Sequence, residues 1–176
     1  MGIRQDEKAI KALLQNIELF ISKLNKKFVE IKTDLFILIE DSPELTEAVN
    51  ILGENKIIFP LLEYNHVSIR NDVNAKEGLL LILAKDFEAR SPALKKSTKW
   101  GDLADDLSFL FNNIDIRHNN VEGKNAKTVI QNMTEPDLLN WYNITYRLYL
   151  TCVLAGTYNE KLKGEIEGLK QQVSHK

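Results

Sequence analysis

Residues 134–153 read TEPDLLNWYNITYRLYLTCV, and this stretch decides the fold class of the chain. It opens with a helix-start signal: Thr134 offers a capping hydroxyl, and the next three residues supply two acids and a proline in the first turn. Two apolar stripes then follow at helical spacing, so most sides of this helix should be covered. We expect it at the centre of a helical bundle. The stripes are Leu138, Trp141, Leu148 and Cys152, and Leu139, Tyr142, Tyr146, Tyr149 and Val153.

A second regular pattern lies near the start of the chain. Apolar residues recur there at alternating spacings of four and three, which is the heptad pattern of helices that pack lengthwise. Charged residues fall off this seam, so we predict one helix of roughly 30 residues that ends before Asp41-Ser42-Pro43. The seam should pack inside the bundle, and self-association through it is the alternative. Its residues are Ile10, Leu14, Ile17, Ile21, Leu24, Phe28, Ile31, Leu35 and Leu38.

Further helix signals follow in order along the chain. Ser42-Pro43-Glu44 should start a helix that ends at Gly53. Residues 55–75 should form a short helix and a loop. A helix over about 75–89 should stop at Ser91-Pro92, because proline removes a backbone hydrogen bond.

The next helix should begin near residue 97 and carry an apolar stripe that His118 extends if the helix runs on. Asn119, Asn120 and Gly123 should end it, since these residues tolerate the left-handed conformation that closes helices. On this prediction His118 faces the core, whereas Arg117 and Asn113, which stands four positions before it, share another face.

The composition is that of one folded domain. The chain has 176 residues, of which 44% are hydrophobic and 27% charged, as in ordinary globular proteins. A more polar helix over residues 158–173, bent or interrupted near its glycines, should complete the structure. We therefore predict an all-α fold, a single helical bundle of about five to seven helices with a long N-terminal helix, over residues 1–176.

Charge and cysteine content exclude several classes of protein. Lys and Arg (23) nearly balance Asp and Glu (25), so any contact with nucleic acid must be local. Cys152, the single cysteine, should be a buried thiol in a cytoplasmic protein. We see no secretory signal and no apolar run long enough for a membrane. The histidines are scattered, so we expect no metal and no cofactor.

The segment from Asn113 to Asn120, NIDIRHNN, concentrates the groups that could act on RNA. Imidazole exchanges protons near neutral pH, so His118 could take the proton of a ribose 2′-hydroxyl. Arg117 could stabilise the charge that develops on the phosphate. We take His118, Arg117 and Asn113 as candidate catalytic residues, and Asn119, Asn120 and Lys124 as candidate binding residues.

A polar Asn/Arg/His cluster at the end of a penultimate helix, followed by a loop and an aromatic-rich helix, resembles the HEPN family of small helical-bundle proteins. The family motif is an Arg, four to six residues, then a His, often with a polar residue after the Arg. Here Asn113 stands five positions before His118, where the Arg would be, and Arg117 is adjacent to the histidine. Arg70-Asn71 matches the first half of the motif, but no histidine follows at the required distance.

The resemblance implies a metal-independent ribonuclease of phage-defence or toxin–antitoxin type, or a catalytically degraded relative. It also implies a homodimer with two copies of the motif across the interface, and RNA or a protein partner such as an antitoxin or defence component. The alternative is that the same residues merely close a helix, whose C-terminus favours a nearby cation. The protein would then be a non-enzymatic helical interaction or regulatory protein.

Overall fold

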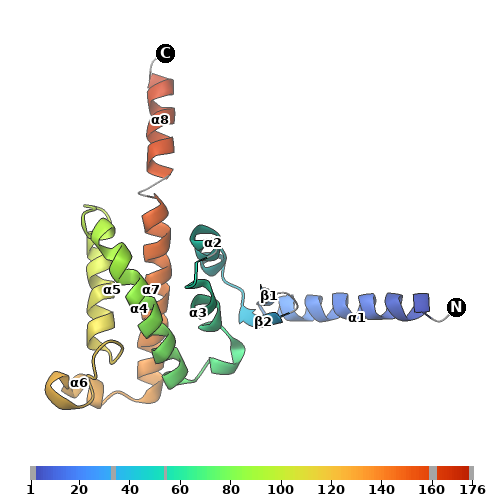
Figure 1. Cartoon of the computed structure of the whole chain (residues 1–176), viewed down its shortest axis with the longest axis horizontal. Helices are drawn as coiled ribbons and strands as arrows, with labels where there is room; N and C mark the ends of the chain where they lie inside the picture. Colours follow the sequence, from blue (N-terminus) through green and yellow to red (C-terminus); the bar gives the residue numbers. More distant parts are fainter. Residues whose placement is uncertain (1–2, 33–34, 54, 159–161, 175–176) are drawn as a thin grey trace.

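The computed structural model describes residues 3–32, 35–53, 55–158 and 162–174, and shows a mainly helical protein with one small sheet (Figure 1). An N-terminal helix and a β-hairpin precede a group of packed helices, and a last helix follows them. The N-terminal elements are α1 (Ile3–Lys23), β1 (Lys26–Lys32) and β2 (Leu35–Glu40). The helices that follow are α2 (Pro43–Leu52), α3 (Ile58–Glu63), α4 (Val73–Lys95), α5 (Gly101–Asn113), α6 (Thr128–Gln131), α7 (Glu135–Thr157) and α8 (Lys163–Ser174), with short 3-10 turns η1 (Val67–Ile69) and η2 (Gly123–Asn125).

The central position of α7 is confirmed. It packs against α2, α4 and α5, which surround it in Figure 1. Thr134 caps its N-terminus as predicted, and the cap is a full capping box, in which the Thr134 hydroxyl accepts from the Asp137 amide and the Asp137 carboxylate accepts from the Thr134 amide. Ser42 likewise caps α2, and Gly53 ends that helix with a φ of 58°.

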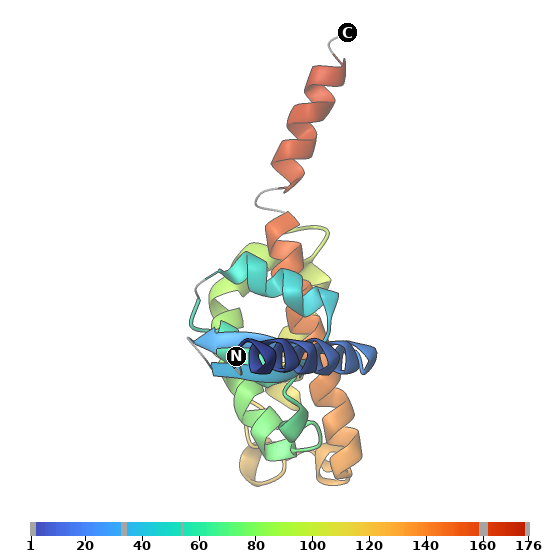
Figure 2. The ribbon, with the colours of Figure 1, turned by 90° about the vertical axis from the view of Figure 1, so that its right-hand side faces the viewer.

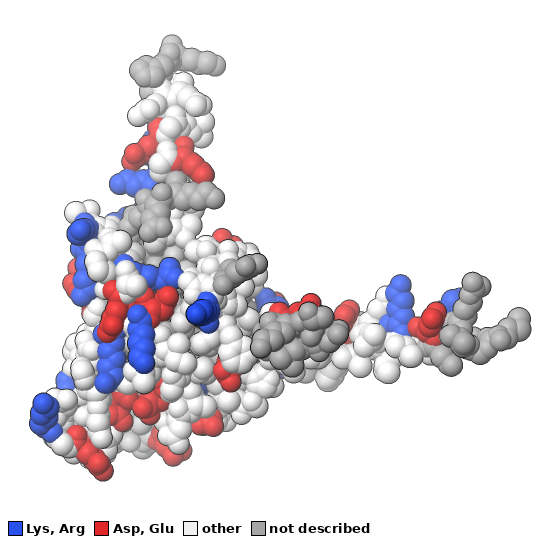
Figure 3. Space-filling model, viewed as in Figure 1, with Lys and Arg blue, Asp and Glu red and all other residues white. Residues whose placement is uncertain are grey.

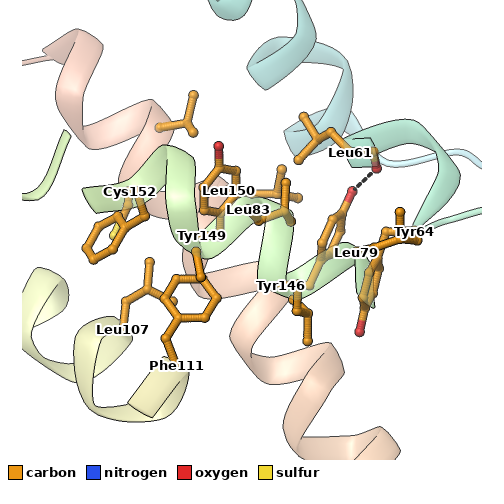
Figure 4. Close-up of a cluster of buried hydrophobic side chains, with 14 of the residues drawn as sticks. Leu61, Tyr64, Leu79, Leu83, Leu107, Phe111, Tyr146, Tyr149, Leu150 and Cys152 are labelled. Atoms are coloured by element: carbon orange, nitrogen blue, oxygen red, sulfur yellow. Dashed lines mark hydrogen bonds between the residues drawn. The ribbon is translucent and has the colours of Figure 1, made fainter. Parts of the chain in front are cut away.

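Aromatic side chains of α7 form the middle of the core (Figure 4). The Tyr146 ring stacks on Tyr64 with centroids 4.1 Å apart, and its hydroxyl donates to the Leu61 carbonyl at 2.8 Å. On the same helix the Tyr149 hydroxyl donates to Asp86 of α4 at 2.6 Å. Cys152 is buried as predicted, and burial raises the pKa of its thiol to about 12.

The predicted long N-terminal helix and the strictly all-α class are wrong. The helix ends at Lys23 because Asn25 adopts a left-handed conformation, with a φ of 54°. The second half of the heptad seam then forms the antiparallel hairpin of β1 and β2, whose connecting residues 33–34 lie outside the described part of the chain. Ile39 of β2 is fully buried and fixes the hairpin to the bundle, where it also pairs with His66.

Two predicted helix ends are also displaced. Helix α4 passes through Ser91-Pro92 to Lys95, and the Ser91 hydroxyl donates to the Glu88 carbonyl, the acceptor that Pro92 leaves without an amide donor. Helix α5 ends at Asn113 and therefore does not carry His118.

The terminal helices lie outside the bundle. Figures 1 and 2 show α1 leading away from the hairpin and α8 continuing beyond the end of α7. The predicted interruption near the glycines does not fall at them, because α7 runs through Gly156 and α8, which begins at Lys163, runs through Gly164 and Gly168. Residues 159–161, between the two helices, lie outside the described part of the chain. None of the described helices combines the length and apolar character needed to cross a membrane.

Candidate functional site

The backbone turns sharply after α5 and sets the positions of the candidate residues. The Ile114 amide closes the helix on the Leu110 carbonyl, and Asp115 then adopts a left-handed conformation with a φ of 64°. Ile114 and Ile116 both remain buried on either side of Asp115. The chain therefore leaves the helical path, and the side chains that follow do not occupy the faces predicted for a continuous helix.

Arg117 points into the bundle. Its Nη2 donates to the Ala84 carbonyl of α4 at 2.6 Å and lies 3.1 Å from a Glu88 carboxylate oxygen. The guanidinium carbon also lies 5.4 Å from the centroid of the Phe111 ring, and only 17% of the side chain is exposed. The predicted face shared by Arg117 and Asn113 does not form. Arg117 instead anchors the segment after α5 to α4.

Asn120 holds the following loop together from within. It is 1% exposed, its Oδ1 accepts from the Asp115 amide at 2.9 Å, and its Nδ2 donates to the Asn125 carbonyl at 3.1 Å. Its own amide donates to Asp115 Oδ1 at 2.6 Å, and its carbonyl accepts from the Lys127 amide at 2.7 Å. The side-chain amide of Asn120 is thus used inside the protein.

Asn119 also serves the backbone, although it is exposed. Its Oδ1 accepts from the amides of Val121 at 3.0 Å and Glu122 at 2.7 Å, which is the geometry of an Asx turn. Both asparagines predicted as binding residues therefore shape the loop.

His118, unlike Arg117, is exposed to solvent, so the predicted core-facing position is wrong. It lines a shallow polar hollow of about 490 Å³ at the α6 end of the bundle. Four of the six candidate residues meet there, whereas Arg117 and Asn119 do not line it. The lining residues are Asn112, Asn113, His118, Asn120, Lys124, Asn125, Ala126 and Lys127.

The hollow is a basic, hydrogen-bonding surface. Two lysines and one histidine line it together with four asparagines, and no carboxylate is among its lining residues in the described part of the chain. Lys127 donates to Asn113 Oδ1, and Asn113 Nδ2 donates to the Phe109 carbonyl at 2.6 Å, so the last turn of α5 is tied to the loop. Elsewhere basic and acidic side chains alternate over the face seen in Figure 3.

Our sequence analysis missed Lys127, Asn112 and Asn125. Lys127 stands three residues after Lys124, and this spacing of two cations close to a histidine was the available signal. In chemical terms the hollow offers cations and amides for a phosphate group, and one imidazole for proton transfer. Within the described residues no cluster of three or more His, Cys, Asp or Glu could hold a metal ion.

Comparisons of the chain with protein-family models, with curated proteins and with solved structures return no match. The resemblance to the HEPN family therefore rests on the polar cluster within residues 113–120 and on the loop and aromatic-rich helix that follow it. Of its motif the hollow contains the histidine, His118, and Asn113 in the place of the arginine.

Proposed function

We propose that this protein binds RNA in the hollow around His118, as a HEPN-like protein of phage-defence or toxin–antitoxin type acting in the cytoplasm. The observation that carries the proposal is the meeting of His118, Lys124 and Lys127 on one hollow with no lining carboxylate. A phosphate group attracts lysine ammonium groups and accepts hydrogen bonds from asparagine amides. The chain as a whole has a net charge of -2, which does not attract RNA, so binding depends on this local group.

Cleavage at this site would use His118 as the general base. The imidazole takes the proton of a ribose 2′-hydroxyl, the 2′-oxygen forms a bond to phosphorus, and the bond from phosphorus to the 5′-oxygen breaks. The leaving 5′-oxygen takes its proton from water, and the product carries a 2′,3′-cyclic phosphate. Lys124 and Lys127 are the cations placed to stabilise the charge on the phosphate.

The test separates binding from cleavage. Single-stranded RNA binding is measured by fluorescence anisotropy, and cleavage by gel analysis of the same labelled RNA. We expect Lys124→Ala combined with Lys127→Ala to weaken binding at least tenfold and to reduce the salt dependence of the affinity, because two phosphate contacts are lost. Lys56→Ala is the matched control, since Lys56 is an exposed lysine outside the hollow.

The His118 variants then decide between an active ribonuclease and a degraded relative. We expect His118→Ala to reduce cleavage about 10²-fold or more while changing RNA affinity less than the double lysine variant. Wild-type protein that binds RNA without cutting it would identify the degraded form. Wild-type protein that fails to bind RNA at low salt would contradict the whole proposal.

A second candidate function, that of a helical interaction protein, is favoured by one observation. Helix α1 exposes an apolar stripe at heptad spacing that no other described helix covers, and its residues include Ile10 (57% exposed), Leu14 (54%) and Phe20 (64%). We propose that a second copy of the chain covers it, because identical stripes related by a twofold axis complement each other. Phe28 of the hairpin that follows α1 is exposed as well.

Light scattering tests this homodimer. We expect about twice the chain mass of 20.2 kDa at micromolar concentration. Leu14→Glu should shift the protein to the monomer because it places a charge in the stripe, whereas Gln15→Glu, one position outside the stripe, should leave the dimer intact. A wild-type mass near 20 kDa would contradict the homodimer and indicate that a different protein, such as an antitoxin or defence component, covers the stripe of α1.

A further inference from the structure

A second cleft lies away from the His118 hollow, where β2, α2 and the segment after α3 face α4 and α7. Its volume is about 540 Å³, which is within the usual range for small-molecule sites. Lys76, in the second turn of α4, lines the cleft together with Tyr64 and Asn143. None of these residues takes part in the proposed RNA site.

Lys76 is a buried cation with no ion pair to any residue that the structure describes. Only 5% of the residue is exposed, its Nζ donates to Asn143 Oδ1 at 2.7 Å, and it lies 4.4 Å from the centroid of the Tyr64 ring. No carboxylate of the described residues lies within ion-pairing distance of it. An ammonium group has three donor hydrogens, so the neutral Asn143 oxygen and an aromatic face leave part of its hydrogen-bonding capacity unused and do not replace an ion-pair partner.

The surroundings make this position more unfavourable. Lys76 lies near the N-terminus of α4, where the helix dipole opposes a positive charge. Burial lowers the pKa of its amine, and the negative charge of Glu40 only partly opposes this effect. The Tyr64 ring beneath Lys76 is fixed by its stack on Tyr146, which Figure 4 shows, and the Tyr64 hydroxyl donates to Asn143 Oδ1 at 3.2 Å. The amine is therefore held in place by rigid neighbours.

We propose that this cleft binds a small ligand through an anionic group, a carboxylate or a phosphate, which pairs with Lys76. Arg147 also lines the cleft and supplies a further cation, whereas Arg70, another lining residue, lies 3.6 Å from a Glu40 carboxylate oxygen. Glu40, Asp41 and Glu44 line it as well, so an extended polyanion such as RNA is disfavoured. The ligand is thus a compact molecule that carries one anionic group.

Thermal unfolding in the presence of simple anions tests the site. The wild-type protein is titrated with inorganic phosphate and, separately, with acetate, at ionic strength held constant with sodium chloride. We expect the Tm to rise and saturate with at least one of the two anions, because a ligand that binds only the folded state stabilises it. The anion that acts identifies the phosphate or the carboxylate class.

Two lysine variants assign the effect to the cleft. Lys76→Met keeps most of the length of the side chain and removes a buried charge, so we expect a folded protein whose Tm no longer responds to the anion. Lys85→Met, which changes an exposed lysine of the same helix, should respond like the wild type. If Lys76→Met fails to fold, NMR of the wild-type protein still decides, since the Asn143 side-chain amide and Tyr64 signals should shift with the anion.

Three results would overturn the proposal: no saturable Tm shift with either anion, an undiminished shift in Lys76→Met, or NMR shifts confined to other residues. Its outcome is independent of the RNA experiments, because no residue of the His118 hollow lines this cleft.

Discussion

Asn120→Ala should destabilise the protein strongly and disturb the RNA site at the same time. The substitution leaves the Asp115 amide without its acceptor, which costs about 1–3 kcal/mol for a buried donor. It also removes the hydrogen bond to the carbonyl of Asn125, an exposed residue, for about 1 kcal/mol more. We therefore expect the free energy of unfolding to fall by about 2–4 kcal/mol.

Urea denaturation followed by circular dichroism measures this loss. Asn119→Ala is the matched control, because Asn119 is exposed and bonds only to nearby amides of exposed residues, so its loss should be below about 1 kcal/mol. RNA affinity should fall with Asn120→Ala, since the loop that positions Lys124 loosens. Equal losses of unfolding free energy in the two variants, or a loss below about 0.5 kcal/mol for Asn120→Ala, would refute the inference that the buried hydrogen bonds of Asn120 hold the loop together.

Three further predictions follow from buried groups. Arg117→Ala should lower the free energy of unfolding by about 1–3 kcal/mol in urea titrations, because the hydrogen bond to the Ala84 carbonyl is lost. A loss of RNA affinity with unchanged stability would show instead that Arg117 contacts RNA directly. Cys152 should resist Ellman's reagent at pH 8 until the protein unfolds, because its pKa of about 12 leaves little thiolate, and rapid stoichiometric labelling of the native protein would contradict this. Burial raises the pKa values of Tyr64 and Tyr149, so these hydroxyls lose their protons at a lower pH in the unfolded chain than in the native protein. Their contribution to the free energy of unfolding should be full below pH about 10 and fall above it. A urea midpoint that is unchanged between pH 8 and pH 11 would argue against this prediction.

The parts of the fold that could be predicted are those fixed by short-range chemistry. The capping residues Thr134 and Ser42 each act on the amide three residues away, so their role can be read from the sequence. The central position of α7 followed from apolar side chains on two faces. The N-terminal seam was misjudged because a spacing of three and four residues does not reveal that Asn25 takes a left-handed conformation and lets the chain reverse into a hairpin.

The candidate site was predicted in part for a related reason. His118, Asn113, Asn120 and Lys124 do meet, because a short loop keeps neighbours in sequence near one another in space. The directions of the side chains could not be predicted, since a single left-handed residue, Asp115, ends the helical periodicity on which they were assigned. Lys76 could not be recognised either, because its burial depends on segments far from it in sequence.

The separation of α1 from the His118 hollow affects how a dimer would engage RNA. Figure 1 places α1 on one side of the bundle and the α6 end, where the hollow lies, on another. Two copies joined through α1 would hold their hollows apart rather than combine them into one groove. One RNA strand could then occupy both, and the second contact would form at a high effective concentration, which can raise the overall affinity by about 10²–10⁴-fold. RNA length would thereby become a determinant of recognition, since only strands long enough to reach both hollows would gain this avidity.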